Sequence, residues 1–106
     1  MSGLWLLIDD FRDLPVDAIA RNPISAKKLL AIGDWECVCF DHDLSDKYGE
    51  TGYDLLVWAI KNNYLPEKVQ LVTSNPVGRQ SMANALLACN YTTKDGINFK
   101  LVKHAF

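Results

Sequence analysis

Two short stretches of the sequence place carboxylates directly after apolar runs. The run LWLLI (4–8) ends at Asp9 and Asp10, and the run CVCF (37–40) is followed by an Asp-His-Asp triplet (41–43). Carboxylates grouped at the end of a buried strand repel one another and lose hydration, so the grouping costs stability. A divalent cation would offset that cost. An oxygen-only set of ligands suits Mg²⁺ (or Mn²⁺) better than zinc.

The candidate metal ligands are the carboxylates of Asp9, Asp10, Asp41 and Asp43. In open α/β sheets, ligands bind outside the carboxyl ends of the strands, where these side chains are expected. The histidine between two of them, His42, is either a proton-transfer group or a hydrogen-bonded structural histidine. Other aspartates have an ordinary explanation as helix caps or turn residues. These are Asp13, Asp17, Asp46 and Asp54.

A second polar group follows the apolar run that begins at residue 68. Asn75 is a plausible N-cap, with Pro76 at the first position of the helix. The start of a helix has free N–H groups and a partial positive charge, so it is also a ready site for an anion. The residues predicted to bind phosphate are Thr73, Ser74, Asn75, Gly78 and Arg79.

Strands and helices alternate along the chain, which is typical of an α/β sheet. The predicted strands cover 4–8, 37–40, 68–73 and 97–102, with a weaker candidate at 16–20, and the predicted helices cover 25–33, 51–65 and 75–90. Only about six residues separate the predicted strands 4–8 and 16–20, whereas a parallel crossover needs a dozen or more. Either an extended connection crosses the sheet without a helix, or that pair of strands is antiparallel.

Several details of these elements follow from local patterns. Ser25 is the expected N-cap of the first helix, and the alternating segment 97–102 is expected to be an edge strand. On the second helix, the predicted buried stripe consists of Tyr53, Leu56, Val57, Ile60 and Tyr64. If the helices cover only one face of the sheet, the other face exposes residues from 4–8. Such an apolar surface predicts a homo-oligomer or a protein partner.

The bulk composition is that of one folded domain, residues 1–106. The chain has 106 residues, of which 49% are hydrophobic and 23% charged, and a net charge of −2, which argues against binding to double-stranded DNA. The three cysteines have no CxxC spacing and are expected to be buried free thiols in a reducing compartment. The apolar run 4–8 is too short to span a membrane. We therefore expect a cytoplasmic protein without a membrane partner.

Four stretches together resemble the cyclic-phosphate processing receiver-like family, a divergent branch of the response-regulator receiver fold. They are LLIDDFRDLP (6–15), CFDHDLS (39–45), ETGYDLLVWAI (50–60) and VTSNPVGRQSM (72–82). The resemblance extends from about Leu4 to Met82, which is most of the chain, and its motifs are long and occur in the family's order.

This resemblance implies a flavodoxin-like or receiver-like sheet of about five mostly parallel strands in the order 2-1-3-4-5. The first and last receiver helices would be missing or reduced, which would explain the short first connection. By similarity to receivers, Asp10 and Asp41 would ligate the metal, and Asp9 would act through water. A backbone carbonyl near Asp43 would complete the shell. Asp41 would occupy the phospho-acceptor position.

Two positions depart from the family's pattern. Val72 stands where the family usually has a histidine just before the serine of the fourth strand, so one candidate acid or base is missing. The lysine that follows the fifth strand of receivers is matched only by Lys103. Both departures concern the catalytic residues and leave the predicted fold unaffected.

The function that this resemblance implies is a metal-dependent phosphoesterase or phosphotransfer domain acting on cyclic phosphates. Its ligand would be a phosphorylated small molecule, a nucleotide or an RNA end. Arg12 would bind phosphate oxygens, Asp41 or a bound water would attack, and His42 would move the proton. Two alternatives remain open. One is a non-catalytic module that binds a phosphorylated ligand or a protein, and the other is a signalling receiver phosphorylated on Asp41.

Overall fold

The computed structural model describes residues 3–102 and contains one mixed sheet with helices packed against it. The elements are β1 (Trp5–Ile8), β2 (Ala18–Ala20), α1 (Pro23–Ile32), β3 (Cys37–Phe40), α2 (Gly52–Lys61), β4 (Lys68–Leu71), α3 (Pro76–Ala88), β5 (Tyr91–Thr93) and β6 (Asn98–Leu101). The strands lie in the order β2-β1-β3-β4-β6-β5, and the first four run parallel. The α/β class and the mostly parallel, receiver-like sheet are therefore confirmed.

The connection between β1 and β2 crosses the sheet without a helix. The two strands pair in parallel, with Leu7 opposite Ile19, so the antiparallel alternative is wrong. Residues 9–17 form the connection, and Leu14 and Val16 pack from it against the face of the sheet. The first receiver helix is missing, as the resemblance implied.

The far edge of the sheet differs from the prediction of one edge strand at 97–102. Residues 91–93 form an additional strand, β5, which pairs antiparallel with β6, and β6 pairs antiparallel with β4. β6 thus lies inside the sheet and β5 forms the edge, so the edge assignment is wrong. A strand of three residues is too short to produce a periodic signal of its own. No helix follows β6 within residues 3–102, and Lys103 lies outside the described residues.

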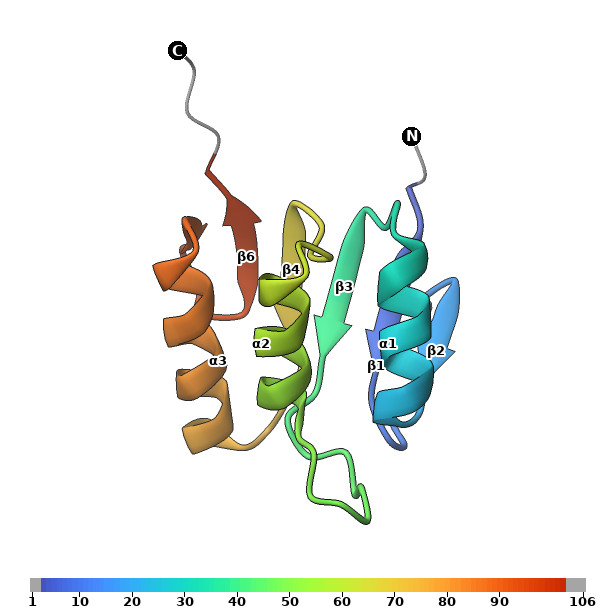
Figure 1. Ribbon diagram of the computed structural model, residues 1–106. Helices are drawn as coiled ribbons and strands as arrows, with labels where there is room; N and C mark the ends of the chain where they lie inside the picture. Colours follow the sequence, from blue (N-terminus) through green and yellow to red (C-terminus); the bar gives the residue numbers. More distant parts are fainter. Residues whose placement is uncertain (1–2, 103–106) are drawn as a thin grey trace.

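All three helices lie on one face of the sheet (Figure 1). Strand side chains alternate between the two faces, so alternate residues of each strand point towards the helices. The main core lies between the sheet and the helices and includes Leu6, Ile8, Val38, Phe40, Val69, Leu71, Leu30, Leu55, Leu56, Met82 and Leu86. A smaller cluster on the opposite face contains Leu7, Cys37 and Cys39. Within the described part of the chain, every helix is too short or too polar to cross a bilayer.

The helix starts are defined by side-chain caps. In α1 the N-cap is Asn22 and not the predicted Ser25, because the Asn22 side chain accepts a hydrogen bond of 2.9 Å from the Ser25 N–H. In α2 the cap is a capping box, in which Thr51 and Asp54 each accept a hydrogen bond from the other's backbone N–H. These reciprocal bonds satisfy two N–H groups that the helix itself cannot satisfy.

The buried side of α2 is rotated relative to the predicted stripe. The helix buries Leu55, Leu56 and Ala59, whereas Tyr53 is exposed and Val57 is half-buried. Apolar residues occur around most of this helix, so the pattern alone does not select one side. Contact with the sheet and with α1 and α3 selects it.

Candidate metal and phosphate site

Three carboxylates from neighbouring strands meet at the carboxyl edge of the sheet. β1 and β3 pair in parallel with Ile8 opposite Phe40, so the residues that follow them emerge side by side. Asp9, Asp10 and Asp41 each offer a carboxylate oxygen, and these oxygens all lie within 4.8 Å of one another. Asp9 and Asp41 are buried, with 1% and 8% of their surface exposed. Such closely spaced carboxylates require a compensating positive charge.

The Asp9 carboxylate is held by the loop that follows it. The N–H groups of Phe11 and Arg12 donate to its Oδ1 at 3.0 and 2.9 Å. Arg12 Nη1 donates to Asp9 Oδ2 at 2.9 Å and to the Val72 carbonyl at 2.5 Å. Arg12 therefore ties the end of β1 to the end of β4 and provides part of the compensating charge.

The Asp41 carboxylate shows the cost of crowding that the sequence predicted. Burial raises the pKa of Asp41, and the neighbouring Asp9 charge raises it further. Hydrogen bonds from the His42 N–H, at 2.9 Å, and from the Thr73 hydroxyl lower this pKa without cancelling the rise. The donor set consists of carboxylate oxygens and includes neither His nor Cys, so it fits a hard cation such as Mg²⁺.

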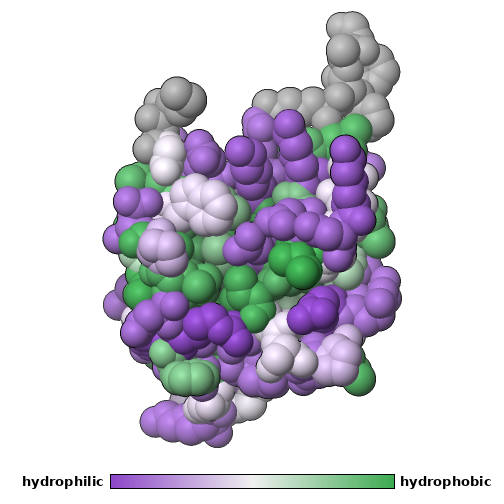
Figure 2. Space-filling view, turned by 180° about the vertical axis from the view of Figure 1, so that it is seen from behind, coloured by the Kyte–Doolittle hydropathy of each residue, from purple (hydrophilic) through white to green (hydrophobic). Residues whose placement is uncertain are grey.

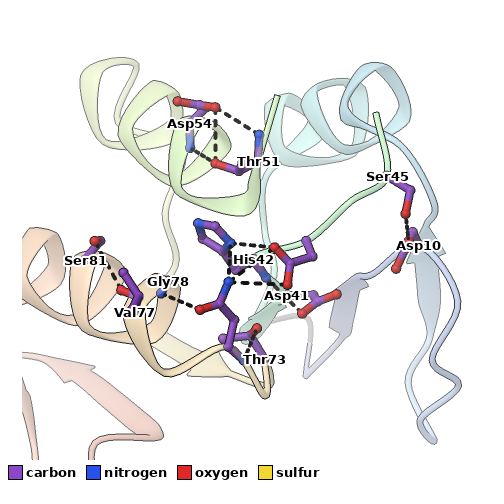
Figure 3. Close-up of polar contacts among 12 residues, drawn as sticks. Asp10, Asp41, His42, Ser45, Thr51, Asp54, Thr73, Val77, Gly78 and Ser81 are labelled. Atoms are coloured by element: carbon purple, nitrogen blue, oxygen red, sulfur yellow. Dashed lines mark hydrogen bonds and ion pairs between the residues drawn. The ribbon is translucent and has the colours of Figure 1, made fainter. Parts of the chain in front are cut away.

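Ser45 also contacts this cluster, although the sequence analysis did not select it as a site residue. Its hydroxyl donates to Asp10 Oδ2 at 2.6 Å (Figure 3). This bond anchors the loop between β3 and α2 beside the carboxylates. The available signal was its place at the end of the CFDHDLS stretch (39–45), but a serine in a loop is common and does not indicate a contact.

Asp43, a predicted ligand, lies outside the cluster of three carboxylates. Its side chain is 65% exposed, and its Oδ1 lies 2.9 Å from His42 Nδ1. Asn75 Nδ2 donates to the same oxygen at 3.4 Å. The hydrogen bond with His42 lowers the pKa of Asp43. The structure thus joins the Asp43 side chain to the start of α3 and does not join it to the metal-ligand candidates.

The His42 ring points towards α3, on the side away from the carboxylates of Asp10 and Asp41 (Figure 3). It packs against Gly78, where an added Cβ would lie 2.3 Å from the ring's Cγ. Only glycine leaves room for the imidazole in this orientation. His42 is therefore held by hydrogen bonding and packing, while its role in proton transfer remains a prediction.

The residues predicted to bind phosphate lie together at the start of α3. The Gly78 N–H donates to Asn75 Oδ1 at 3.0 Å, and the Asn75 N–H donates to Thr73 Oγ1 at 3.1 Å. Arg79 Nη2 donates to the Thr73 carbonyl at 2.5 Å, and Ser74 is exposed. Two of the N–H groups expected to receive a phosphate are therefore engaged within the protein. Of the residues predicted to bind phosphate, only Thr73 contacts the carboxylate cluster, by a side-chain hydrogen bond to Asp41.

Gly52, at the start of α2, supports the site from the other side. Its N–H donates to the His42 carbonyl at 2.7 Å. A Cβ at Gly52 would lie 1.8 Å from the carbonyl oxygen of Asp41, so this helix approaches the end of β3 as closely as glycine allows. Gly52 lies in the ETGYDLLVWAI stretch (50–60) that resembles the family, but the sequence pattern does not indicate this contact.

The chain matches the family described as the cyclic-phosphate processing receiver domain over residues 4–88. A search among curated proteins found no match. The matched segment includes the strands that carry the carboxylates and the three helices that cover the core. The protein belongs to the family of cyclic-phosphate processing receiver domains.

Proposed function

We propose that this protein hydrolyses a cyclic phosphate ester with the help of a divalent cation held by Asp9, Asp10 and Asp41. The observation that carries the proposal is the meeting of their three carboxylate oxygens within 4.8 Å, in a chain that belongs to a cyclic-phosphate processing family. When bound, Mg²⁺ would neutralise charge on phosphate oxygens and make water more acidic.

Arg12 is proposed to hold both Asp9 and the substrate. Its Nη1 is engaged with Asp9 and with the Val72 carbonyl. A guanidinium has five N–H donors in a planar fork, so others remain for a phosphate oxygen. The Arg12 side chain is 33% exposed, which leaves it accessible from solvent beside the carboxylates.

In the proposed reaction, a water oxygen forms a bond to phosphorus and one ring P–O bond breaks, giving a phosphate monoester and a free hydroxyl group. Asp41 would accept a proton from the water, and His42 would donate a proton to the leaving oxygen. Asp43 supports this role of His42, because its carboxylate lies 2.9 Å from Nδ1 and orients the ring. The leaving oxygen would lie on the α3 side of the site.

Phosphorus NMR tests this function directly. The substrates are cyclic mononucleotides, cyclic oligonucleotides and RNA with a 2′,3′-cyclic end, each with Mg²⁺ and with EDTA. We expect turnover that EDTA abolishes and that Asp41→Asn lowers by about 100-fold or more, as for loss of a catalytic acid or base. Asp34→Asn, at an exposed position between α1 and β3, is the matched control. No turnover on any substrate, with Asp41→Asn equal to the wild type, would end the proposal.

A binding module without turnover is the second candidate. It is supported by the orientation of His42, whose ring points away from the carboxylates of Asp10 and Asp41. Calorimetry with the same cyclic phosphates separates the two candidates. Binding that survives both EDTA and Asp41→Ala, without product formation, would favour the module over the enzyme.

A further inference from the structure

The sheet face opposite the helices has an apolar centre within a hydrophilic rim (Figure 2). Leu7, Cys37 and Cys39 form its buried centre, and the half-buried Trp5 and Ile19 pack beside them. The connection between β1 and β2 covers only part of this face. An apolar sheet face in this position is where a second layer of structure packs in other α/β proteins.

A hollow of about 200 Å³ lies on the uncovered part of this face. Its lining includes Trp5 and Cys37 on one side and Lys68, Asn98 and Lys100 on the other. The hollow therefore extends from β1 and β3 across β4 to β6. The β1–β2 connection thus protrudes on one side of this face, and the hollow lies on the other side, over β4 and β6.

Charged groups of opposite sign lie on the two sides of the hollow. On β1, Trp5 Nε1 donates to Glu36 Oε2 at 3.3 Å, which places a carboxylate beside the indole. Along the same row Trp5 is opposite Cys37, and Cys37 is opposite Lys68. Lys68 is in turn opposite Lys100 on β6. Both lysines are exposed and form no ion pair with any residue in the described range 3–102.

We infer that this face is the interface of a homodimer in which two copies stack sheet on sheet. A two-fold axis parallel to the strands and passing over β3 has β1 and β2 on one side and β4 and β6 on the other. It places β1 of one copy over β4 of its partner. Trp5 and Glu36 then face the partner subunit's Lys68, and the symmetry repeats this contact in reverse.

The distribution of charge and shape is what favours a second copy as the occupant. A face with one sign of charge would select a partner of opposite charge, whereas this face carries both signs on opposite sides of β3 and is complementary to itself. The shape agrees, because the exposed Pro15 in the β1–β2 connection would enter the hollow over β4 and β6 of the partner. Stacked sheets lie about 10 Å apart, which brings such groups into contact.

The test is sedimentation velocity and light scattering of the full chain from micromolar to millimolar concentration. We expect a dimer for the wild type, and we expect Lys68→Glu and Glu36→Lys each to weaken association about tenfold or more, because like charges then face each other. An equimolar mixture of the two variants should recover dimers, since opposite charges face each other in both symmetric contacts. Lys28→Glu, an equal charge change on an exposed residue of α1, should leave association unchanged.

Three results would overturn the inference. They are a monomeric wild type at every concentration, undiminished association of Lys68→Glu, and a mixture of the two variants that dimerises no better than each variant alone. Circular dichroism of each variant establishes that it is folded. The wild-type mass remains decisive even if one variant does not fold.

Discussion

At the scale of single residues, Asp41 is held from several sides. Its carboxylate accepts hydrogen bonds from the His42 N–H and the Thr73 hydroxyl, and its carbonyl lies against Gly52. A residue with this many partners has little freedom to move when its charge changes. The unfavourable energy of its buried charge should therefore lower the free energy of unfolding, which can be measured.

Alanine substitutions at two glycines test how rigidly Asp41 and His42 are held. An added Cβ on Gly52 would meet the Asp41 backbone at 1.8 Å, whereas one on Gly78 would meet the His42 imidazole, which can rotate. Overpacking costs about 1–3 kcal/mol, and we expect Gly52→Ala at or above the upper end and Gly78→Ala at the lower end. Urea denaturation measures both free energies of unfolding. Equal losses would contradict the distinction, and Gly78→Ala should also shift the NMR signals of the His42 ring.

Asp41→Asn tests whether carboxylate crowding destabilises the cation-free protein. Burial and the Asp9 charge raise the pKa of Asp41 in the folded state, so ionisation of Asp41 costs stability above that pKa. This cost disappears as the pH falls towards the pKa of the unfolded chain. In EDTA we expect Asp41→Asn to increase the free energy of unfolding at neutral pH, and the increase to vanish in acid.

Urea denaturation at neutral and acidic pH measures this difference. Asp34→Asn is the control, because Asp34 is exposed and has a φ of 64°, which asparagine readily adopts. A stabilisation of equal size in the control, or one that persists in acid, would show that Asp41 crowding is not the cause.

At the scale of elements, α1 shows how a cap determines where a helix starts. Asn22 accepts the Ser25 N–H at 2.9 Å, whereas Ser25 contributes only its backbone to the cap. We expect Asn22→Ala to lower the free energy of unfolding by about 1 kcal/mol, and Ser25→Ala to change it little. Chemical denaturation of the two variants measures this. A larger loss of stability for Ser25→Ala than for Asn22→Ala would favour Ser25 as the N-cap, as predicted from the sequence.

Tyr91 adds a side-chain hydrogen bond between the hairpin of β5 and β6 and the segment before β4. Its hydroxyl donates to the Pro66 carbonyl at 2.5 Å, and burial raises the pKa of Tyr91 to about 12. Because the unfolded chain loses this proton near pH 10, stability should fall between about pH 10 and 12. Tyr91→Phe should remove that part of the pH dependence and cost about 1 kcal/mol at neutral pH, for the lost hydrogen bond.

Denaturation across the alkaline range provides the measurement. Tyr48→Phe is the control, since Tyr48 is 81% exposed and should leave the slope unchanged. An unchanged slope in Tyr91→Phe would mean that another group causes the alkaline loss of stability.

At the scale of the whole molecule, the fold and the candidate cation site depend on each other. Asp9 and Asp10 follow β1 and Asp41 follows β3, and only the folded sheet holds them together. A cation present at ten times its dissociation constant would therefore add about 1.4 kcal/mol to the free energy of unfolding. We expect Mg²⁺ and Mn²⁺ to raise the Tm of the wild type in scanning fluorimetry, and not that of Asp10→Asn. No shift with either ion at millimolar concentration would contradict the site.

Much of this architecture is predictable because it follows from short-range patterns. Continuous apolar runs such as 4–8 and 37–40 indicate buried parallel strands, and parallel strands deliver the residues after them to one edge. The meeting of Asp9, Asp10 and Asp41 follows from that arrangement. The pairing of Thr51 with Asp54 in a cap follows from their spacing.

Other features depended on contacts between distant segments. The short strand β5 is stabilised by its pairing with β6, and its three residues have no pattern of their own. The buried side of α2 depended on the neighbours that it meets. The direction of β2 was open because the length of a connection allows more than one path.

The sequence alone determined the order of strands and helices as far as α3, the location of the acidic group at the carboxyl edge and the membership of the family. Only the tertiary structure decided that the Asp43 and His42 side chains turn towards α3 while Asp41 stays with Asp9. The physical reason is that the direction of the His42 side chain depends on its packing against Gly78, which lies more than thirty residues further along the chain. Local sequence preferences carry no information about such a contact.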